Sequence, residues 1–451
     1  QKYMTKFYYL TVLLLAIISC TTTPKTSVTL HIEGSRTDYP TFLNTQDSVY
    51  SITLDSTGTA VVNLPENFQP NYGMIRFGLM RFPVYLEPNK SFELSIKIEE
   101  HNVTPNFTGE GANKNIYLNS DIFKNNAPDL KVSEDVFLKA LEEQKSKLIA
   151  NLETQNFEQE FVKKEKKRIH YSLYSILPMY ISYHPYYAKV DNYQPSEHFY
   201  DVLEVAVQEE PELINMQEYK NALNGYIELA ANKNMKQHDG LISLKKQLNF
   251  IQNNFKSPAI IDFTVDHFIS AYVGRYGIDN LSEFLEIYET KVIDSQKKSS
   301  FNALCNKWAK ISKGQPAIDF KYLDINGKEV CLKDLSGKYI YIDCWATWCG
   351  PCRGEIPHLQ KLEHRYKNKN IHFVSISCDQ NKADWEKMVK EEKLGGIQLH
   401  YGGDNTFMNF FMITGIPRFI LLDQEGKIIQ ANATRPSNPE TIKTFDNLRG
   451  I

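Results

Sequence analysis

Residues 27–112 alternate apolar and polar positions in short runs, as at Val28, Leu30 and Ile32. Alternation with a period of two is typical of strands that bury one face. Turn-forming residues, such as those at 56–58, separate the runs. This pattern predicts an antiparallel β domain over residues 27–112.

Residues 113–310 change to the spacing of amphipathic helices, as at Leu241, Leu244 and Leu248. We therefore expect a central α-helical region. Seven tyrosines gather between residues 171 and 193. They could line a peptide groove, because tyrosine combines a rigid apolar body with a polar tip, or they could pack between helices. The histidines of this region lack the spacing of metal ligands.

Residues 311–451 alternate strand and helix patterns. In order, we expect a hairpin at Asn326-Gly327, a strand at 339–344, a helix at 352–366, a strand at 371–377, helices at 384–393 and 407–412, strands at 418–422 and 427–431, and a helix at 439–448. This order predicts a mixed sheet with helices on both faces. The whole chain is thus expected to be a multidomain α+β protein.

The first residues have the pattern of an export signal. Lys2 and Lys6 precede an apolar run of about a dozen residues, which is too short to span a bilayer but suits a signal peptide. We expect a signal peptide at 1–19 and a tether at 20–26. The segment that ends at Cys20, Ile-Ile-Ser-Cys, resembles the lipobox of bacterial lipoproteins. That resemblance implies cleavage before Cys20 and lipid attached to it; an ordinary signal peptide that ends in a chance cysteine is the alternative.

The composition and motifs of the chain argue against several classes of function. The chain has 451 residues, of which 42% are hydrophobic and 23% charged, so low-complexity disorder is not expected. A formal charge of -3 gives no basis for a nucleic-acid surface. The sequence also lacks a Walker loop and a dinucleotide-binding glycine motif.

Cys349 and Cys352 carry the candidate chemistry. They lie where a predicted strand ends and a predicted helix begins. The amide groups and the positive end of a helix dipole favour a thiolate at Cys349. Cys352, three residues further on, could attack a mixed disulfide on Cys349. Pro351 suits the first turn of a helix because proline needs no amide hydrogen there.

The motif around these cysteines, Trp345-Ala-Thr-Trp-Cys-Gly-Pro-Cys352, resembles the active site of the thioredoxin fold. The following Arg-Gly-Glu-Ile-Pro357 is similar to the TlpA/ResA branch, whose members are membrane-tethered thiol-disulfide oxidoreductases. Gly-Ile-Pro417 resembles the cis-proline loop that pairs with bound substrate in this family. The resemblance covers 311–451 and implies a thioredoxin-like domain. The region 27–112 is similar to a small β domain that precedes such domains in Gram-negative lipoproteins.

The resemblance also implies roles for two acids. Asp343 matches the buried acid that thioredoxins place behind the inner cysteine, where it could carry a proton to or from Cys352. Many TlpA/ResA relatives have a neutral residue there. Glu355 matches an acid that could tune the thiol pKa values, or it could be a solvated helix carboxylate.

The other four cysteines are expected to be structural, with a second disulfide possible but no pairing that the sequence can give. They are Cys305, Cys331, Cys344 and Cys378.

The sequence therefore predicts a lipid-anchored oxidoreductase that faces the periplasm of a Gram-negative bacterium. It would reduce protein disulfides through Cys349 and Cys352 and receive electrons from an upstream membrane or periplasmic donor. No cofactor, metal or nucleic acid is expected. The alternatives are an envelope scaffold or binding lipoprotein with a redox head and, as a minor reading, a thiol peroxidase, whose usual motif around the cysteine is absent. The substrate and the direction of electron flow stay open.

Overall fold

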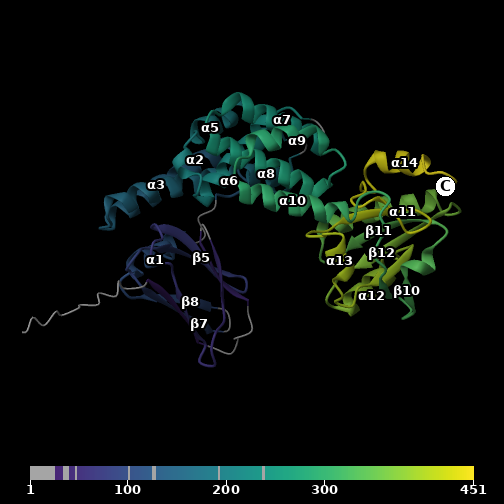
Figure 1. Cartoon of the computed structure of the whole chain (residues 1–451), viewed down its shortest axis with the longest axis horizontal. Coiled ribbons are helices and arrows are strands. Elements are labelled where there is room, and N and C mark those ends of the chain that lie inside the picture. The colour runs from purple at the N-terminus through teal and green to yellow at the C-terminus, as the bar shows by residue number, and fades with distance from the viewer. Residues whose placement is uncertain are drawn as a thin grey trace, which may run out of the picture. The chain divides into compact units, whose positions relative to one another are not determined.

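The computed structural model describes residues 26–33, 40–45, 48–99, 102–123, 128–190, 193–235 and 239–451 (Figure 1). The predicted signal peptide at 1–19, Cys20 and the tether as far as residue 25 lie outside these ranges. The chain divides into two compact units, Gln1–Val207 with Asn215–Ala222 and Gln208–Ile214 with Leu223–Ile451.

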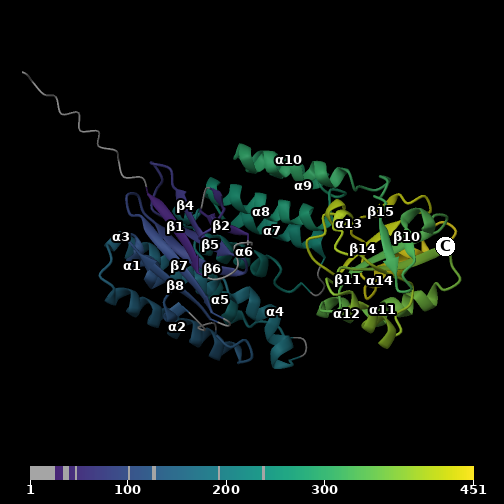
Figure 2. The same cartoon turned by 90° about the horizontal axis from the view of Figure 1, so that it is seen from below.

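The first unit contains the predicted β domain as two four-stranded sheets, in the orders β4-β1-β7-β8 and β3-β2-β5-β6. The strands are β1 (Ser27–Glu33), β2 (Thr41–Asn44), β3 (Val49–Ile52), β4 (Thr59–Asn63), β5 (Asn71–Phe77), β6 (Met80–Leu86), β7 (Phe92–Glu99) and β8 (Asn102–Thr108). Within each sheet, neighbours are antiparallel except β1 and β7, which are parallel. Figure 2 shows β1, β7 and β8 side by side.

A single apolar core joins the two sheets. The inward positions of the alternating runs, such as Leu30 on β1 and Leu43 on β2, belong to one buried cluster. The period-two pattern therefore identified the buried face correctly, because successive side chains of a strand point to opposite faces.

Helices complete the first unit. They are α1 (Ala112–Leu118), the 3-10 turn η1 (Asp121–Phe123), α2 (Glu134–Thr154), α3 (Gln159–Tyr174), α4 (Leu177–Ala188) and α5 (Glu197–Ala206). Among the clustered tyrosines, Tyr171, Tyr174 and Tyr180 are buried in the helix packing. On α4, Tyr186 is 78% exposed. Packing between helices, one of the two predicted roles of the cluster, therefore holds for Tyr171, Tyr174 and Tyr180.

The second unit begins with helices that precede its sheet. They are the 3-10 turn η2 (Pro211–Leu213), the end of α6 (Gln217–Ala231), α7 (Gly240–Asn254), α8 (Pro258–Tyr276), α9 (Ser282–Lys291) and α10 (Ser295–Ala309). The central helix α8 contacts α7, α9 and α10. Within the ranges that the structure describes, no helix is long and apolar enough to cross a membrane.

A seven-stranded mixed sheet follows, in the order β10-β9-β13-β12-β11-β14-β15. Its elements are β9 (Lys321–Asp324), β10 (Glu329–Cys331), η3 (Leu332–Leu335), β11 (Tyr339–Trp345), α11 (Gly350–Arg365), β12 (Ile371–Ser377), α12 (Lys382–Glu391), β13 (Ile397–His400), α13 (Thr406–Phe410), β14 (Arg418–Leu422), β15 (Ile428–Gln430) and α14 (Pro439–Asp446). β11, β12 and β13 are parallel to one another, whereas β14 is antiparallel to β11. The predicted mixed sheet is confirmed.

The strand β13 corrects the predicted element order, which had none between α12 and α13. β13 has only four residues and buries three in succession. A run this short shows no alternation, so the sequence pattern could not separate it from a loop.

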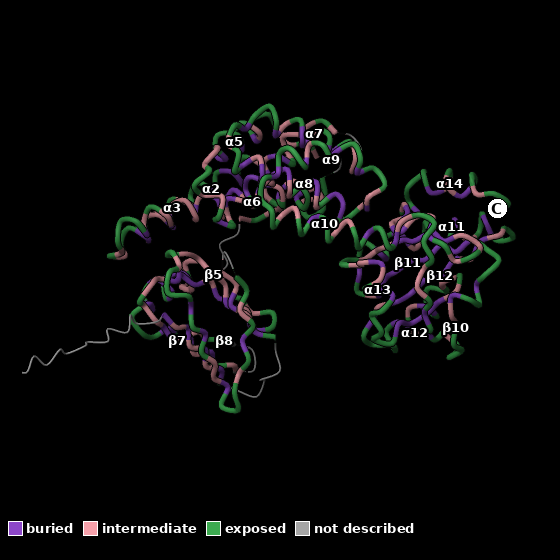
Figure 3. Tube along the Cα trace, in the orientation of Figure 1, coloured by how far each residue is buried: buried purple, intermediate pink, exposed green. Residues whose placement is uncertain are grey.

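Helices cover both faces of this sheet, as predicted. α11 and α14 lie on one side of β11 and β12, and α12 lies on the other (Figure 1). Leu359 of α11 and Phe445 of α14 share a core cluster with Tyr341 of β11. Trp385 of α12 belongs instead to the cluster that contains the candidate cysteines. Figure 3 shows the resulting band of buried residues along β11 and β12.

Candidate active site

Cys349 and Cys352 lie at the junction that the sequence predicted. Strand β11 is buried along its whole length and ends at Trp345, and α11 begins at Gly350. Cys349 is the N-cap of α11, and its sulfur accepts the N–H of Cys352 at 3.2 Å. The two cysteines form a disulfide in this structure. A sulfur at this position faces the amide groups of the first helical turn, which stabilise negative charge.

The loop between β11 and α11 is fixed by a buried carboxylate. Asp379 is 2% exposed. The Thr347 N–H donates to both of its oxygens at 3.1 and 3.0 Å, and the Thr347 hydroxyl donates at 2.7 Å. The Ser377 hydroxyl donates to the same carboxylate at 2.7 Å. Because a buried carboxylate is costly unless it is hydrogen-bonded, these contacts hold Thr347, two residues before Cys349, in one place.

His400 supports Asp379 from the next strand. The His400 Nδ1 accepts the N–H of Gly402 at 3.2 Å, so the hydrogen of this ring lies on Nε2 when the ring is neutral. Nε2 then donates to the backbone oxygen of Asp379 at 2.8 Å. Sequence reasoning missed both residues. A signal was available, since Asp379 follows β12 and His400 ends β13, and parallel strands end at the same edge of a sheet as β11.

The predicted cis-proline loop lies against the dithiol. The Ile416–Pro417 peptide bond is cis. Ile416 packs on the apolar cluster that contains Cys349 and Cys352. Beside them, Trp348 is 70% exposed, whereas the two cysteines are 5% and 4% exposed. The disulfide is thus partly shielded, and the cis-proline loop forms part of its surroundings.

Asp343 is buried in β11 beside Ser375 of β12. Burial and, after it, the negative charge of Glu355 raise the pKa of Asp343 to about 8; Glu363 adds to this rise, and a hydrogen bond from Ser375 opposes it. Burial also raises the pKa of Glu363 to about 7. A carboxyl whose pKa lies near neutrality can both accept and release a proton under physiological conditions.

Glu355, on α11, is buried rather than solvated, so the solvated alternative does not describe its surroundings. Its carboxylate accepts the N–H of Ser437 at 2.9 Å and the Ser437 hydroxyl at 2.8 Å. The side chain therefore links α11 to the loop before α14 and contributes a negative charge near Asp343.

The four remaining cysteines are free thiols in the structure. The Cys378 thiol lies against the same apolar cluster as the dithiol and donates to the Trp345 oxygen at 3.3 Å. Burial raises the pKa of both Cys344 and Cys378, which keeps these thiols protonated and poorly nucleophilic. Across the described part of the chain, no group of three or more His, Cys, Asp or Glu side chains could hold a metal ion.

Comparison with known proteins finds relatives of the domain that carries these cysteines. Residues 312–448 match the Redoxin family model. The thiol-disulfide oxidoreductase ResA of Bacillus cereus is 30% identical over 28% of this chain and 72% of its own length. ResA of Bacillus subtilis is 26% identical over 33% of this chain and 82% of its own length. The solution structure of a protein from Bacteroides vulgatus is 62% identical over 30% of this chain and 90% of that one, with a TM-score of 0.28.

The raised pKa of Asp343 predicts a pH dependence of stability. Between its ordinary value of 3.8 and about 8, the folded protein keeps a proton that the unfolded chain releases, so stability falls as pH rises. In Asp343→Asn this loss disappears. From pH 5 to pH 8, the unfolding free energy of the oxidised wild type should fall by about 2–4 kcal/mol more than that of the oxidised variant.

Urea unfolding of the oxidised proteins at the two pH values measures this difference. The exposed Asp384→Asn variant is the matched control and should follow wild type. If Asp343→Asn loses as much stability as wild type over this range, Asp343 does not titrate there.

Proposed function

Because the chain belongs to the family of ResA thiol-disulfide oxidoreductases, we propose that its Cys349–Cys352 pair reduces disulfides of protein substrates in the periplasm. The observation that carries this proposal is the position of Cys349, at the N-terminus of α11 and beside a cis-proline loop. This placement supports a thiolate at Cys349 and a second thiol within reach of it.

The first step is attack by the Cys349 thiolate on one sulfur of a substrate disulfide. A bond forms between Cys349 and that sulfur, the substrate S–S bond breaks, and the other substrate sulfur leaves as a thiolate that takes up a proton. The N–H of Cys352, which points at the Cys349 sulfur, stabilises the attacking thiolate. The product is a mixed disulfide.

The second step is attack by Cys352 on the Cys349 sulfur, which releases the second substrate thiol and closes the disulfide seen in the structure. Cys352 must lose its proton to attack, and we assign this proton to Asp343, whose pKa of about 8 suits the transfer. Glu355 acts through its charge on Asp343. Overall, two electrons pass from the dithiol to the substrate, and an upstream dithiol donor in the membrane or periplasm restores the reduced pair.

We further propose that lipid on Cys20 holds the protein at a membrane of the Gram-negative envelope. The support is the lipobox that follows a short apolar core. Lipid chains bury many methylene groups and thereby confine a protein to the bilayer surface. Along the sequence, the β domain at 27–112 and the helical region at 113–310 separate this cysteine from the thioredoxin-like domain at 311–451.

Exchange of Cys352 for serine tests the roles of the two cysteines. A serine hydroxyl keeps the size of the group but is too weakly acidic to resolve a mixed disulfide. We expect Cys352→Ser to accumulate covalent complexes with envelope proteins. Such complexes would be visible on non-reducing gels and would disappear with dithiothreitol.

The matched control is Cys349→Ser, which leaves Cys352 shielded and should trap few proteins. Equal trapping by both variants would show that Cys349 is not the sole nucleophile. If neither variant traps a protein and the wild type fails to reduce insulin, the scaffold alternative replaces the reductase. Rapid turnover of peroxide would instead favour the peroxidase.

Exchange of Cys20 for serine tests the anchor. Without the thiol, no lipid can be attached, so Cys20→Ser should move from the membrane fraction to the soluble envelope fraction. Cell fractionation followed by immunoblotting measures this shift, and Cys305→Ser is a control that should stay with the membrane. Unchanged partitioning of Cys20→Ser would rule out this anchor.

A further inference from the structure

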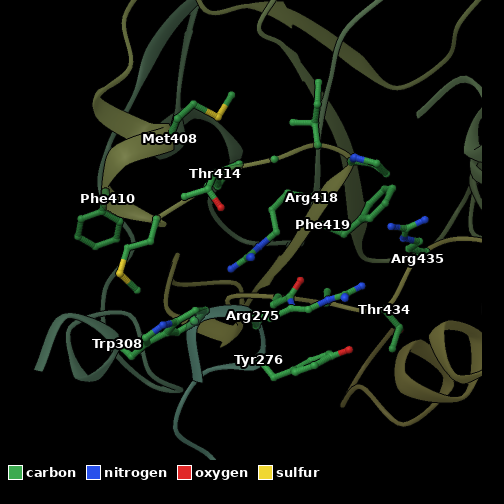
Figure 4. Close-up of a pocket in the computed structure, with 18 of the residues that line it drawn as sticks. Arg275, Tyr276, Trp308, Met408, Phe410, Thr414, Arg418, Phe419, Thr434 and Arg435 are labelled. Atoms are coloured by element: carbon green, nitrogen blue, oxygen red, sulfur yellow. Dashed lines mark hydrogen bonds between the residues drawn. The ribbon is translucent and has the colours of Figure 1, made fainter. Parts of the chain in front are cut away.

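A large cavity of about 1470 Å³ lies within the second unit, next to the cis-proline loop. One wall comes from α8 and α10, with Arg275, Tyr276 and Trp308, and the other from the region around α13 and β14, with Met408, Thr414 and Arg418 (Figure 4). The Asn432 side chain donates to the Arg275 backbone oxygen at 2.6 Å and joins the two walls.

This cavity reaches the candidate active site. Ile416 and Pro417 both line it, and Ile416 also packs on the cluster of Cys349 and Cys352. Ser437, whose N–H and hydroxyl bind Glu355, lines it as well. A molecule in the cavity would therefore lie beside the cis-proline loop and beside the serine that binds Glu355.

The charged residues that line the cavity in the described part of the chain are all positive. None of the described residues that line it is an aspartate or a glutamate. Five lining residues are cations, and none of the five forms an ion pair with a carboxylate within the described ranges. These residues are Arg275, Lys307, Lys310, Arg418 and Arg435. Low-dielectric walls lined by one sign of charge concentrate the field and attract ligands of the opposite sign.

Arg418 is the least solvated of these cations. It is half-buried, its Nε donates to the Ala431 oxygen at 3.0 Å, and its guanidinium lies 5.6 Å from the Trp308 ring. Its buried Nη2 has no hydrogen-bond partner. Burial lowers the pKa of Arg418 to about 10, which reflects the cost of a dehydrated charge without a counterion. A carboxylate would satisfy both the charge and the free N–H groups.

We propose that this cavity binds an acidic peptide segment of the protein substrate, close to the disulfide that the dithiol reduces. This inference rests on the proposed reductase function and names its substrate class. The cavity exceeds the roughly 300–1,000 Å³ typical of small-molecule sites, which favours a peptide. Its apolar side chains, such as Met408 and Phe410, suit the remainder of such a segment.

Two peptides of matched size test the proposal. They are the disulfide-linked dimers of acetyl-Glu-Glu-Cys-Gly-amide and acetyl-Gln-Gln-Cys-Gly-amide. We measure kcat/KM for their reduction by the full chain, kept reduced by a dithiol. Wild type should prefer the glutamate dimer by about tenfold at low salt, and the preference should shrink as salt screens the charges.

The exposed cations allow variants that leave the core intact. The double variant Arg275→Gln with Arg435→Gln should reduce the preference to about twofold. The matched control, Lys367→Gln with Lys369→Gln, removes two exposed charges of the same compact unit outside the cavity and should keep the wild-type preference. A triple variant that adds Arg418→Gln, at the half-buried position, to Arg275→Gln and Arg435→Gln should reduce the preference further.

Two further disulfides separate the possible failures. Hydroxyethyl disulfide carries no charge. If wild type reduces it but does not prefer the glutamate dimer, the cavity proposal fails while the reductase function stands; if wild type reduces neither, the function fails first. Glutathione disulfide carries carboxylates on a small molecule. Reduction of glutathione disulfide as fast as the glutamate dimer, with the same dependence on Arg275 and Arg435, would overturn the assignment to a peptide.

Discussion

The hydrogen bonds between Asp379 and Thr347 fix the loop that positions Cys349, and the rest of the active site depends on that position. Asp379 is nearly inaccessible to solvent, and both of its oxygens are engaged by Thr347. A buried carboxylate tolerates little movement of its donors, because each lost hydrogen bond exposes its desolvation cost. The loop therefore delivers Cys349 to the N-cap of α11 in a fixed position, and that position makes the sulfur a candidate nucleophile.

The charges around the dithiol act in opposite directions. The N-terminus of α11 favours a thiolate at Cys349, whereas the acids Asp343, Glu355 and Glu363 lie in the same domain and disfavour additional negative charge. Burial, and after it the charge of Glu355, raises the pKa of Asp343.

Sequence alone identified the features that depend on local pattern. The dithiol at a strand-helix junction, the buried faces of the strands and the mixed sheet follow from the pattern of residues, whereas the cis bond before Pro417 was implied by the resemblance to the thioredoxin fold. Asp379 and His400 escaped detection because their function depends on which strands are neighbours, and β13 was too short to show a period. The cavity beside Pro417 was equally hidden, since its walls come from segments that lie about a hundred residues or more apart in the sequence.

The reduction potential of the Cys349–Cys352 pair shows whether the dithiol gives electrons to its substrates. Equilibration of the full chain with glutathione or dithiothreitol buffers, followed by alkylation and mass analysis, gives this potential at pH 7. We expect a reducing couple near the value of about -270 mV found for thioredoxin. A potential near the value of about -120 mV typical of a strong oxidant would contradict it, because the pair would then accept electrons from its substrates.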